Sequence, residues 1–129
     1  MGYESKFFAV RDYGFPEEGG LHHSQIIATL DMCKMGDTDG FLDLFSVETP
    51  FTLFLYDYNP DTKEEGYMYV HEDKYGDVLK YIPNEDIDEA IDYIKQASKR
   101  DTYWRYKLLI DFLKTFKKYK NIYIVHYGY

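Results

Sequence analysis

The first two thirds of the chain carries the alternating apolar and polar pattern of β-strands. Runs rich in aromatic and β-branched residues are separated by segments that contain Gly, Pro, Asn or Asp, which favour turns. These runs predict strands at residues 3–13, 24–35, 51–58, 66–70 and 78–82. We expect the last two strands to pair with each other, because a turn-forming segment lies between them.

Residues 24–35 are compatible with two structures. As a strand, the segment gathers one apolar face, made of Ile26, Ala28, Leu30 and Met32. As a helix, it gathers a different apolar face, made of Ile26, Ile27, Leu30 and Cys33. We favour the strand, because it would form a hairpin with residues 3–13 across a glycine-containing loop.

The last third of the chain changes to helical spacing. Asn84 is a suitable N-cap and is followed by acids, after which apolar residues recur at helical intervals: Ile87, Ala90, Ile91 and Ile94. A second helix is predicted over residues 102–118, with an apolar stripe made of Leu109, Phe112, Leu113 and Phe116. Residues 122–127 close the pattern as a strand.

Strands followed by two helices and a final strand predict an α+β fold. We expect a mostly antiparallel sheet of about five to six strands, with the two C-terminal helices packed on one face. Residues 1–129 form a single predicted domain, because this length suits one hydrophobic core.

Composition adds an excess of aromatic residues and a single thiol. The 15 Tyr and 9 Phe suit half-buried strands, and tyrosine also suits protein interfaces because its ring is apolar and its hydroxyl polar. Cys33 is the only cysteine, so the chain forms no internal disulfide, as expected in a reducing compartment. The first residues lack the apolar run of a signal peptide, and no apolar run approaches the ~20 residues of a membrane span. We therefore expect a cytoplasmic protein with no membrane partner.

Charge divides the chain into two parts. The formal net charge is −8, but residues 1–92 contain 21 acids and 6 bases, a net charge of −15. Residues 93–129 contain 2 acids and 9 bases, a net charge of +7. Such asymmetry within one chain is typical of proteins with charged partners.

The acidic part predicts a partner-binding surface on the turns of the sheet and on the first helix. Carboxylates beside tyrosines imitate the phosphates and bases of nucleic acid, so such a surface suits the basic channel of a nucleic-acid-binding enzyme. The alternative is that the acids keep a tyrosine-rich domain in solution. The candidate residues are Asp57, Asp61, Glu64, Glu65, Glu72, Asp73, Asp77, Glu85, Asp86 and Glu89.

The second helix carries the alternative binding surface, a basic stripe. Its lysines fall within one arc facing away from the apolar stripe: Lys107, Lys114, Lys117 and Lys118. Such a stripe could contact phosphates directly, which would make the chain a nucleic-acid-binding module. An ordinary amphipathic helix gives the same pattern and is the simpler interpretation.

A third hypothesis is that the chain binds a metal ion. His22, His23 and Cys33 are candidate zinc ligands, with His71 or His126 as a fourth. Zinc sites usually contain ligand pairs at short spacing, and adjacent histidines point to opposite faces of an extended segment. Loop histidines and a buried free cysteine are therefore the favoured interpretation.

The sequence contains no recognisable catalytic motif. Nucleophilic catalysis needs a nucleophile, a base and an orienting group in contact. G-x-S-x-G, a phosphate-binding glycine loop and the Rossmann fingerprint are all absent. We therefore predict a protein that is not an enzyme, with no catalytic residues and no cofactor.

Three segments resemble small early proteins of phages and prophages of Gram-positive bacteria: residues 1–6 (MGYESK), 26–36 (IIATLDMCKMG) and 125–129 (VHYGY). Small acidic phage proteins of this size include anti-CRISPR proteins and other inhibitors of host defence, which bind host nucleases without catalysis. The resemblance implies an inhibitor that binds a host defence protein, such as a CRISPR nuclease, in the bacterial cytoplasm. It brings no catalytic residues.

Overall fold

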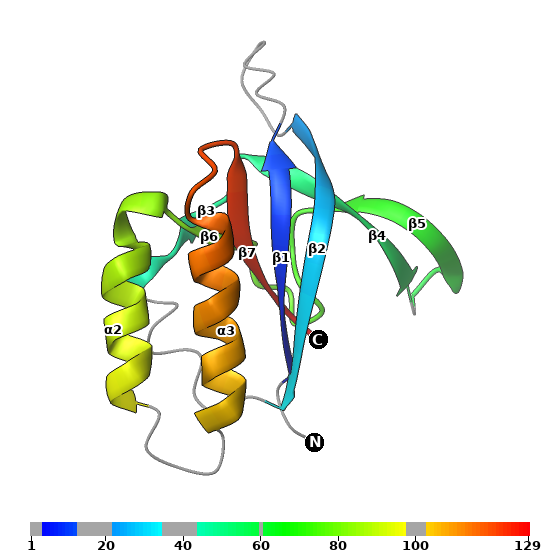
Figure 1. Ribbon diagram of the computed structural model, residues 1–129. Helices are drawn as coiled ribbons and strands as arrows, with labels where there is room; N and C mark the ends of the chain where they lie inside the picture. Colours follow the sequence, from blue (N-terminus) through cyan, green and yellow to red (C-terminus); the bar gives the residue numbers. More distant parts are fainter. Residues whose placement is uncertain (1–3, 13–21, 35–43, 60, 98–102) are drawn as a thin grey trace.

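The computed structural model describes residues 4–12, 22–34, 44–59, 61–97 and 103–129. It confirms the α+β class, with strands first, two helices next and a strand last (Figure 1). The elements in chain order are β1 (Glu4–Asp12), β2 (His22–Lys34), β3 (Val47–Glu48), β4 (Phe51–Asn59), β5 (Glu64–Val70), β6 (Lys80–Ile82), the 3-10 helix η1 (Asn84–Asp86), α2 (Ile87–Ala97), α3 (Tyr103–Phe116) and β7 (Ile122–Gly128).

The strands follow one another across the sheet in the order β3-β6-β7-β1-β2-β4-β5. The first five of these strands form an antiparallel sheet with β7 and β1 near its centre. A short parallel contact at His22↔Phe51 and His23↔Thr52 joins β2 to β4. Strands β4 and β5 form an antiparallel hairpin that projects from the side of the sheet away from the helices (Figure 1).

Residues 24–34 are a strand, as favoured from the sequence, and Met35 lies outside the described residues. β2 pairs antiparallel with β1 along its length, with two register shifts. Its even-numbered residues from Ser24 to Leu30 are half-buried and its odd-numbered residues are exposed, which is the period of a strand with one inward face. Pairing with β1 therefore selects the strand over the helix.

The predicted pairing of residues 66–70 with residues 78–82 is wrong. β5 pairs with β4, and β6 pairs with β3 and β7. Only an isolated bridge between Glu72 and Val78 joins the two regions. The aromatic residues of β5 find aromatic partners on β4, while Ile82 of β6 is buried in the core beneath the helices.

Two hydrophobic clusters lie on the two faces of the sheet. The first combines both helices with inward side chains of the strands, and its members include Phe7, Ile82, Ile94, Leu109 and Ile124. The apolar stripes predicted for the helices lie in this cluster or pack against it. The second cluster combines the opposite face with the base of the β4–β5 hairpin, and its members are Phe8, Val10, Phe51, Leu53, Leu79, Val125 and Tyr127.

The predicted N-cap at Asn84 is wrong. Asn84 is the first residue of η1, and α2 begins only at Ile87. Pro83 precedes it, and no side chain caps this turn. The Asn84 side-chain amide instead donates to the Tyr119 carbonyl oxygen at 3.4 Å, so it ties the helix entry to the segment after α3.

No helix in the described parts of the chain combines the length and apolar character that crossing a membrane requires.

Candidate functional site

The β4–β5 hairpin carries a row of exposed aromatic side chains. Alternation along β4 buries Phe51 and Leu53 in the second cluster and turns Phe54, Tyr56 and Tyr58 outward. The same alternation along β5 half-buries Met68 and Val70. The outward residues, here called the aromatic face, are Phe54, Tyr56, Tyr58, Tyr67 and Tyr69, with exposed fractions from 44% to 69%.

Register across the hairpin brings the rings of the aromatic face together. Tyr56 lies opposite Tyr67, and Phe54 lies opposite Tyr69 with ring centroids 4.8 Å apart. Phe54 also stacks on Tyr67 at 5.3 Å, and Tyr67 meets Tyr56 edge-on at 5.6 Å. Each such pair contributes about 0.5–1 kcal/mol to the hairpin. The rings are therefore ordered by one another while they remain open to solvent.

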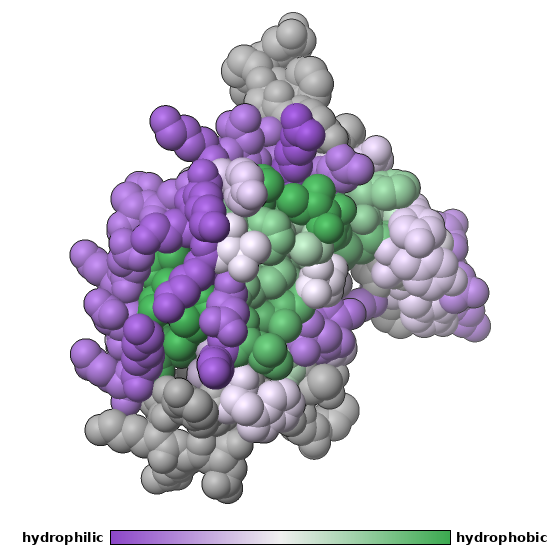
Figure 2. All heavy atoms as spheres, in the orientation of Figure 1, coloured by the Kyte–Doolittle hydropathy of each residue, from purple (hydrophilic) through white to green (hydrophobic). Residues whose placement is uncertain are grey.

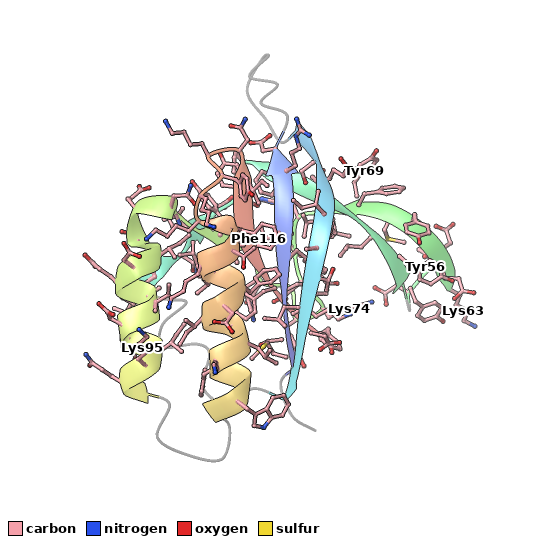
Figure 3. The ribbon with its side chains drawn as sticks, viewed as in Figure 1. Tyr56, Lys63, Tyr69, Lys74, Lys95 and Phe116 are labelled. Atoms are coloured by element: carbon pink, nitrogen blue, oxygen red, sulfur yellow. The ribbon has the colours of Figure 1, made fainter. Side chains whose placement is uncertain are left out.

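Acidic residues surround the tip of this hairpin. Residues 51–70 contain four acids and one lysine, a net charge of −3. Asp61, Glu64 and Glu65 are exposed at or beside the turn, and Glu65 lies opposite Tyr58. Lys63 occupies the turn with a φ of 60°, and its side chain lies at the tip in Figure 3. Asp57 lies opposite Gly66 in the register.

The loop between β5 and β6 holds three further candidate acids, of which one supports the fold. Asp73 Oδ1 accepts hydrogen bonds from the amides of Tyr75 at 2.8 Å and Asp77 at 3.0 Å. Burial raises the pKa of Asp73 above its ordinary value of 3.8, although these backbone amides act in the opposite direction. Glu72 and Asp77 are exposed. Asp73 therefore orders the loop.

The acids of η1 and α2 lie apart from the hairpin, on the other side of the sheet. Glu85 and Glu89 are exposed and Asp86 is half-buried. The Lys117 ammonium forms an ion pair with Asp88 on α2. Figure 2 shows hydrophilic residues gathered over the two helices. The predicted acidic surface is therefore divided among the hairpin, the loop between β5 and β6, and the helices, and in the last group Asp88 pairs with a lysine.

The predicted basic stripe is exposed but not uniformly cationic. Lys107 and Lys114 lie on α3, and Lys117 and Lys118 lie in the turn that follows it. Asp111 is exposed on α3 between the first two lysines, at the helical spacing that places it beside both. Together with the ion pair of Lys117, this acid weakens the field that a phosphate backbone would meet.

The predicted zinc ligands are not brought together. His22 and His23 lie at one end of β2 and Cys33 near the other, ten residues along an extended strand from His23. At about 3.3 Å per residue, this distance is on the order of 30 Å, far beyond the reach of one metal ion. His71 Nε2 lies 3.0 Å from the Thr49 carbonyl oxygen. Among the described side chains, no group of three His, Cys, Asp or Glu residues could hold a metal ion.

One serine–histidine pair lies at the centre of the sheet. His126 Nε2 is 2.9 Å from Ser5 Oγ, and the Phe7 ring lies 5.2 Å from the imidazole. Ser5 is fully buried, so a substrate does not reach its hydroxyl. Burial lowers the pKa of His126 to about 4. The hydrogen bond pairs the buried serine hydroxyl with the half-buried imidazole, which stays neutral near neutral pH.

Sequence reasoning named the acids of the hairpin but missed its aromatic face. The signal was present, because Phe54, Tyr56 and Tyr58 occupy alternate positions of a predicted strand that should face solvent. Large aromatic residues at such positions are unusual unless they meet another surface. The cross-strand partners on β5 were hidden by the wrong pairing of residues 66–70.

Comparison of the chain with protein-family models, with curated proteins and with solved structures found no match to any of them.

Proposed function

We propose that this chain is a non-catalytic inhibitor that binds a host nucleic-acid-handling protein, such as a CRISPR nuclease, through the aromatic face and the acids at the hairpin tip. The observation that carries the proposal is the exposed aromatic face on a projecting, net acidic hairpin. The partner surface is cationic, and the inhibitor occupies it in place of nucleic acid.

Two physical terms support this assignment. Tyrosine rings that are held in place lose little conformational entropy on binding, and aromatic anchors dominate the energies of protein interfaces. The acids Asp61, Glu64 and Glu65 add long-range attraction to a cationic surface, which raises the association rate and makes it depend on salt. The hairpin thus combines aromatic contacts at the interface with long-range electrostatic attraction to the partner.

The test uses the chain as bait for the heparin-binding fraction of a bacterial lysate, which is enriched in nucleic-acid-binding proteins. Captured proteins are identified, purified and titrated against the bait at low and high salt. We expect a basic protein whose affinity falls at least about tenfold with added salt. Duplex or single-stranded nucleic acid should compete for the same protein, and its nuclease activity should fall as the bait is added.

Matched variants assign the binding to the hairpin. Tyr56→Ser/Tyr67→Ser removes the most exposed rings of the aromatic face. Tyr119→Ser is the control, because Tyr119 is 52% exposed but lies beyond α3. Retention of the partner should fall with the double variant alone. Equal retention by both variants, or a complex indifferent to salt, would contradict the proposal.

A further inference from the structure

Strand β5 forms the outer edge of the sheet beside the aromatic face. It is the last strand in the sheet order, and among the described strands it pairs with β4 alone. An edge strand presents backbone N–H and C=O groups to any strand that lies against it. Proteins commonly block such edges with charged residues or proline. In β5 the charged residues are Glu64 and Glu65 at its first two positions, and residues 66–70 (GYMYV) contain no charge and no proline.

The two sides of this edge differ in chemistry. On one side, Glu65, Tyr67 and Tyr69 are exposed and alternate along β5. On the other side, Met68 and Val70 are half-buried, and Val70 packs against the second cluster. A strand placed about 4.8 Å from β5 would therefore lay one row of its side chains beside the aromatic face and the other row beside apolar residues.

We propose that β5 accepts an extended segment of the cationic partner as a further strand of the sheet. Arginine occupies every second position of that segment, on the side of Glu65, Tyr67 and Tyr69, and β-branched apolar residues occupy the positions between. The inference rests on the proposed function, because it specifies how the partner meets the same hairpin. Main-chain pairing supplies affinity, and the alternating side chains supply specificity.

Arginine fits this row for two reasons. Its planar guanidinium stacks on tyrosine within about 6 Å of the ring centroid. The carboxylate of Glu65 lies at one end of the row and complements its charge. The same kind of contact exists within the chain, where the Lys6 ammonium lies 4.3 Å from the centroid of the Tyr129 ring. A second copy of the chain fits less well, because each hairpin carries a net charge of −3.

The test uses three synthetic peptides of the seven-residue length of β5. The first alternates arginine and valine. The second has the same sequence with alternate backbone nitrogens methylated, which removes main-chain donors and leaves every side chain intact. The third replaces arginine with citrulline, which has nearly the same shape without the charge. Each peptide is titrated into the full chain at low salt, and binding is followed by backbone amide chemical shifts.

We expect the first peptide to bind, with the largest shift changes on β5, and the other two to bind at least about tenfold more weakly. Tyr67→Ser should weaken binding of the first peptide, and Tyr119→Ser should leave that binding unchanged. Equal binding of the methylated and parent peptides would overturn strand addition, as would binding away from β5 or dimerisation of the free chain through β5. These results are separate from the bait experiment, which tests the proposed function with the intact partner.

Discussion

Lowering the pH should destabilise this protein through one residue, His126. The imidazole lies between β1 and β6 on the central strand β7, with Ser5 Oγ and the Phe7 ring as neighbours. Burial lowers its pKa from the ordinary value of 6.5 to about 4. The folded protein therefore resists a proton that the unfolded chain accepts readily.

The sign and size of the effect follow from these two pKa values. Between about pH 6.5 and about pH 4 the unfolded state binds more protons, so the free energy of unfolding falls as the pH falls. The loss is about 2 kcal/mol at about pH 5 and approaches about 3 kcal/mol below pH ~4. Above about pH 7 the contribution of His126 to the pH dependence vanishes, because both states then hold a neutral imidazole.

Urea unfolding followed by circular dichroism measures the effect at about pH 7.5 and about pH 5. His126→Gln is the reference protein, since glutamine can still reach Ser5 Oγ but does not titrate. Carboxylates such as Asp73, whose raised pKa acts in the opposite direction, are common to both proteins and cancel in the difference. The wild-type chain should lose about 2 kcal/mol more than the variant over this pH range.

A direct measurement separates this reasoning from a general acid effect. The His126 imidazole signals in an NMR titration of the folded protein should remain those of the neutral ring down to about pH 5. An ordinary titration near pH ~6.5, or equal losses of stability in the wild type and His126→Gln, would show that the imidazole is not buried as described.

Three further predictions concern the hairpin and the core. Tyr56→Ser/Tyr67→Ser should lower the free energy of unfolding by only about 1–2 kcal/mol, because both side chains are exposed and the variant removes two ring pairs, Phe54–Tyr67 and Tyr56–Tyr67. A larger loss in urea unfolding would mean that the rings serve the core of the fold. Gly66→Ala should destabilise the hairpin by about 1–3 kcal/mol, because a residue with a side chain disfavours the φ of 145° even though its Cβ would meet no atom within 4 Å. Unchanged amide hydrogen exchange on β5 would contradict this prediction. Leu109→Ala should cost about 2–5 kcal/mol, because this side chain is fully buried between α3 and the sheet; a thermal melt close to that of the wild type would exclude the packing described.

The local pattern of the sequence was sufficient for the type of most elements but not for their pairing. The stripe of α2 from Ile87 to Ile94 was predicted because helical periodicity is a property of neighbouring residues. The partner of β5 was not predicted, because β4 precedes it and β6 follows it across short connections, and periodicity does not choose between them. The matching side chains Phe54 and Tyr56 on β4 decide the pairing. The first turn before α2 was missed because Asn84 finds its hydrogen bond at Tyr119, far away in the sequence.

The features of the candidate site also divide into those that the sequence predicts and those that depend on the fold. Net charge near the hairpin could be read from residues 51–70, since Asp61, Glu64 and Glu65 are consecutive or nearly so. The ion pair between Asp88 and Lys117 could not be predicted from the sequence, because it depends on α2 and α3 lying side by side. A zinc site with Cys33 failed for the opposite reason: residues that are close in the sequence are carried apart by an extended strand.

The position of β7 has a consequence for how the molecule is made on the ribosome. This strand follows all the others in sequence, yet it lies between β1 and β6 and bonds to both. The β1–β2 and β4–β5 hairpins need only nearby residues and can form during synthesis, whereas β6 has no route to β1 until β7 has been synthesised. During that interval the edges of β1 and β6 that pair with β7 stay open, so assembly of the sheet is a late step. The nascent chain is then most exposed to chaperones and proteases.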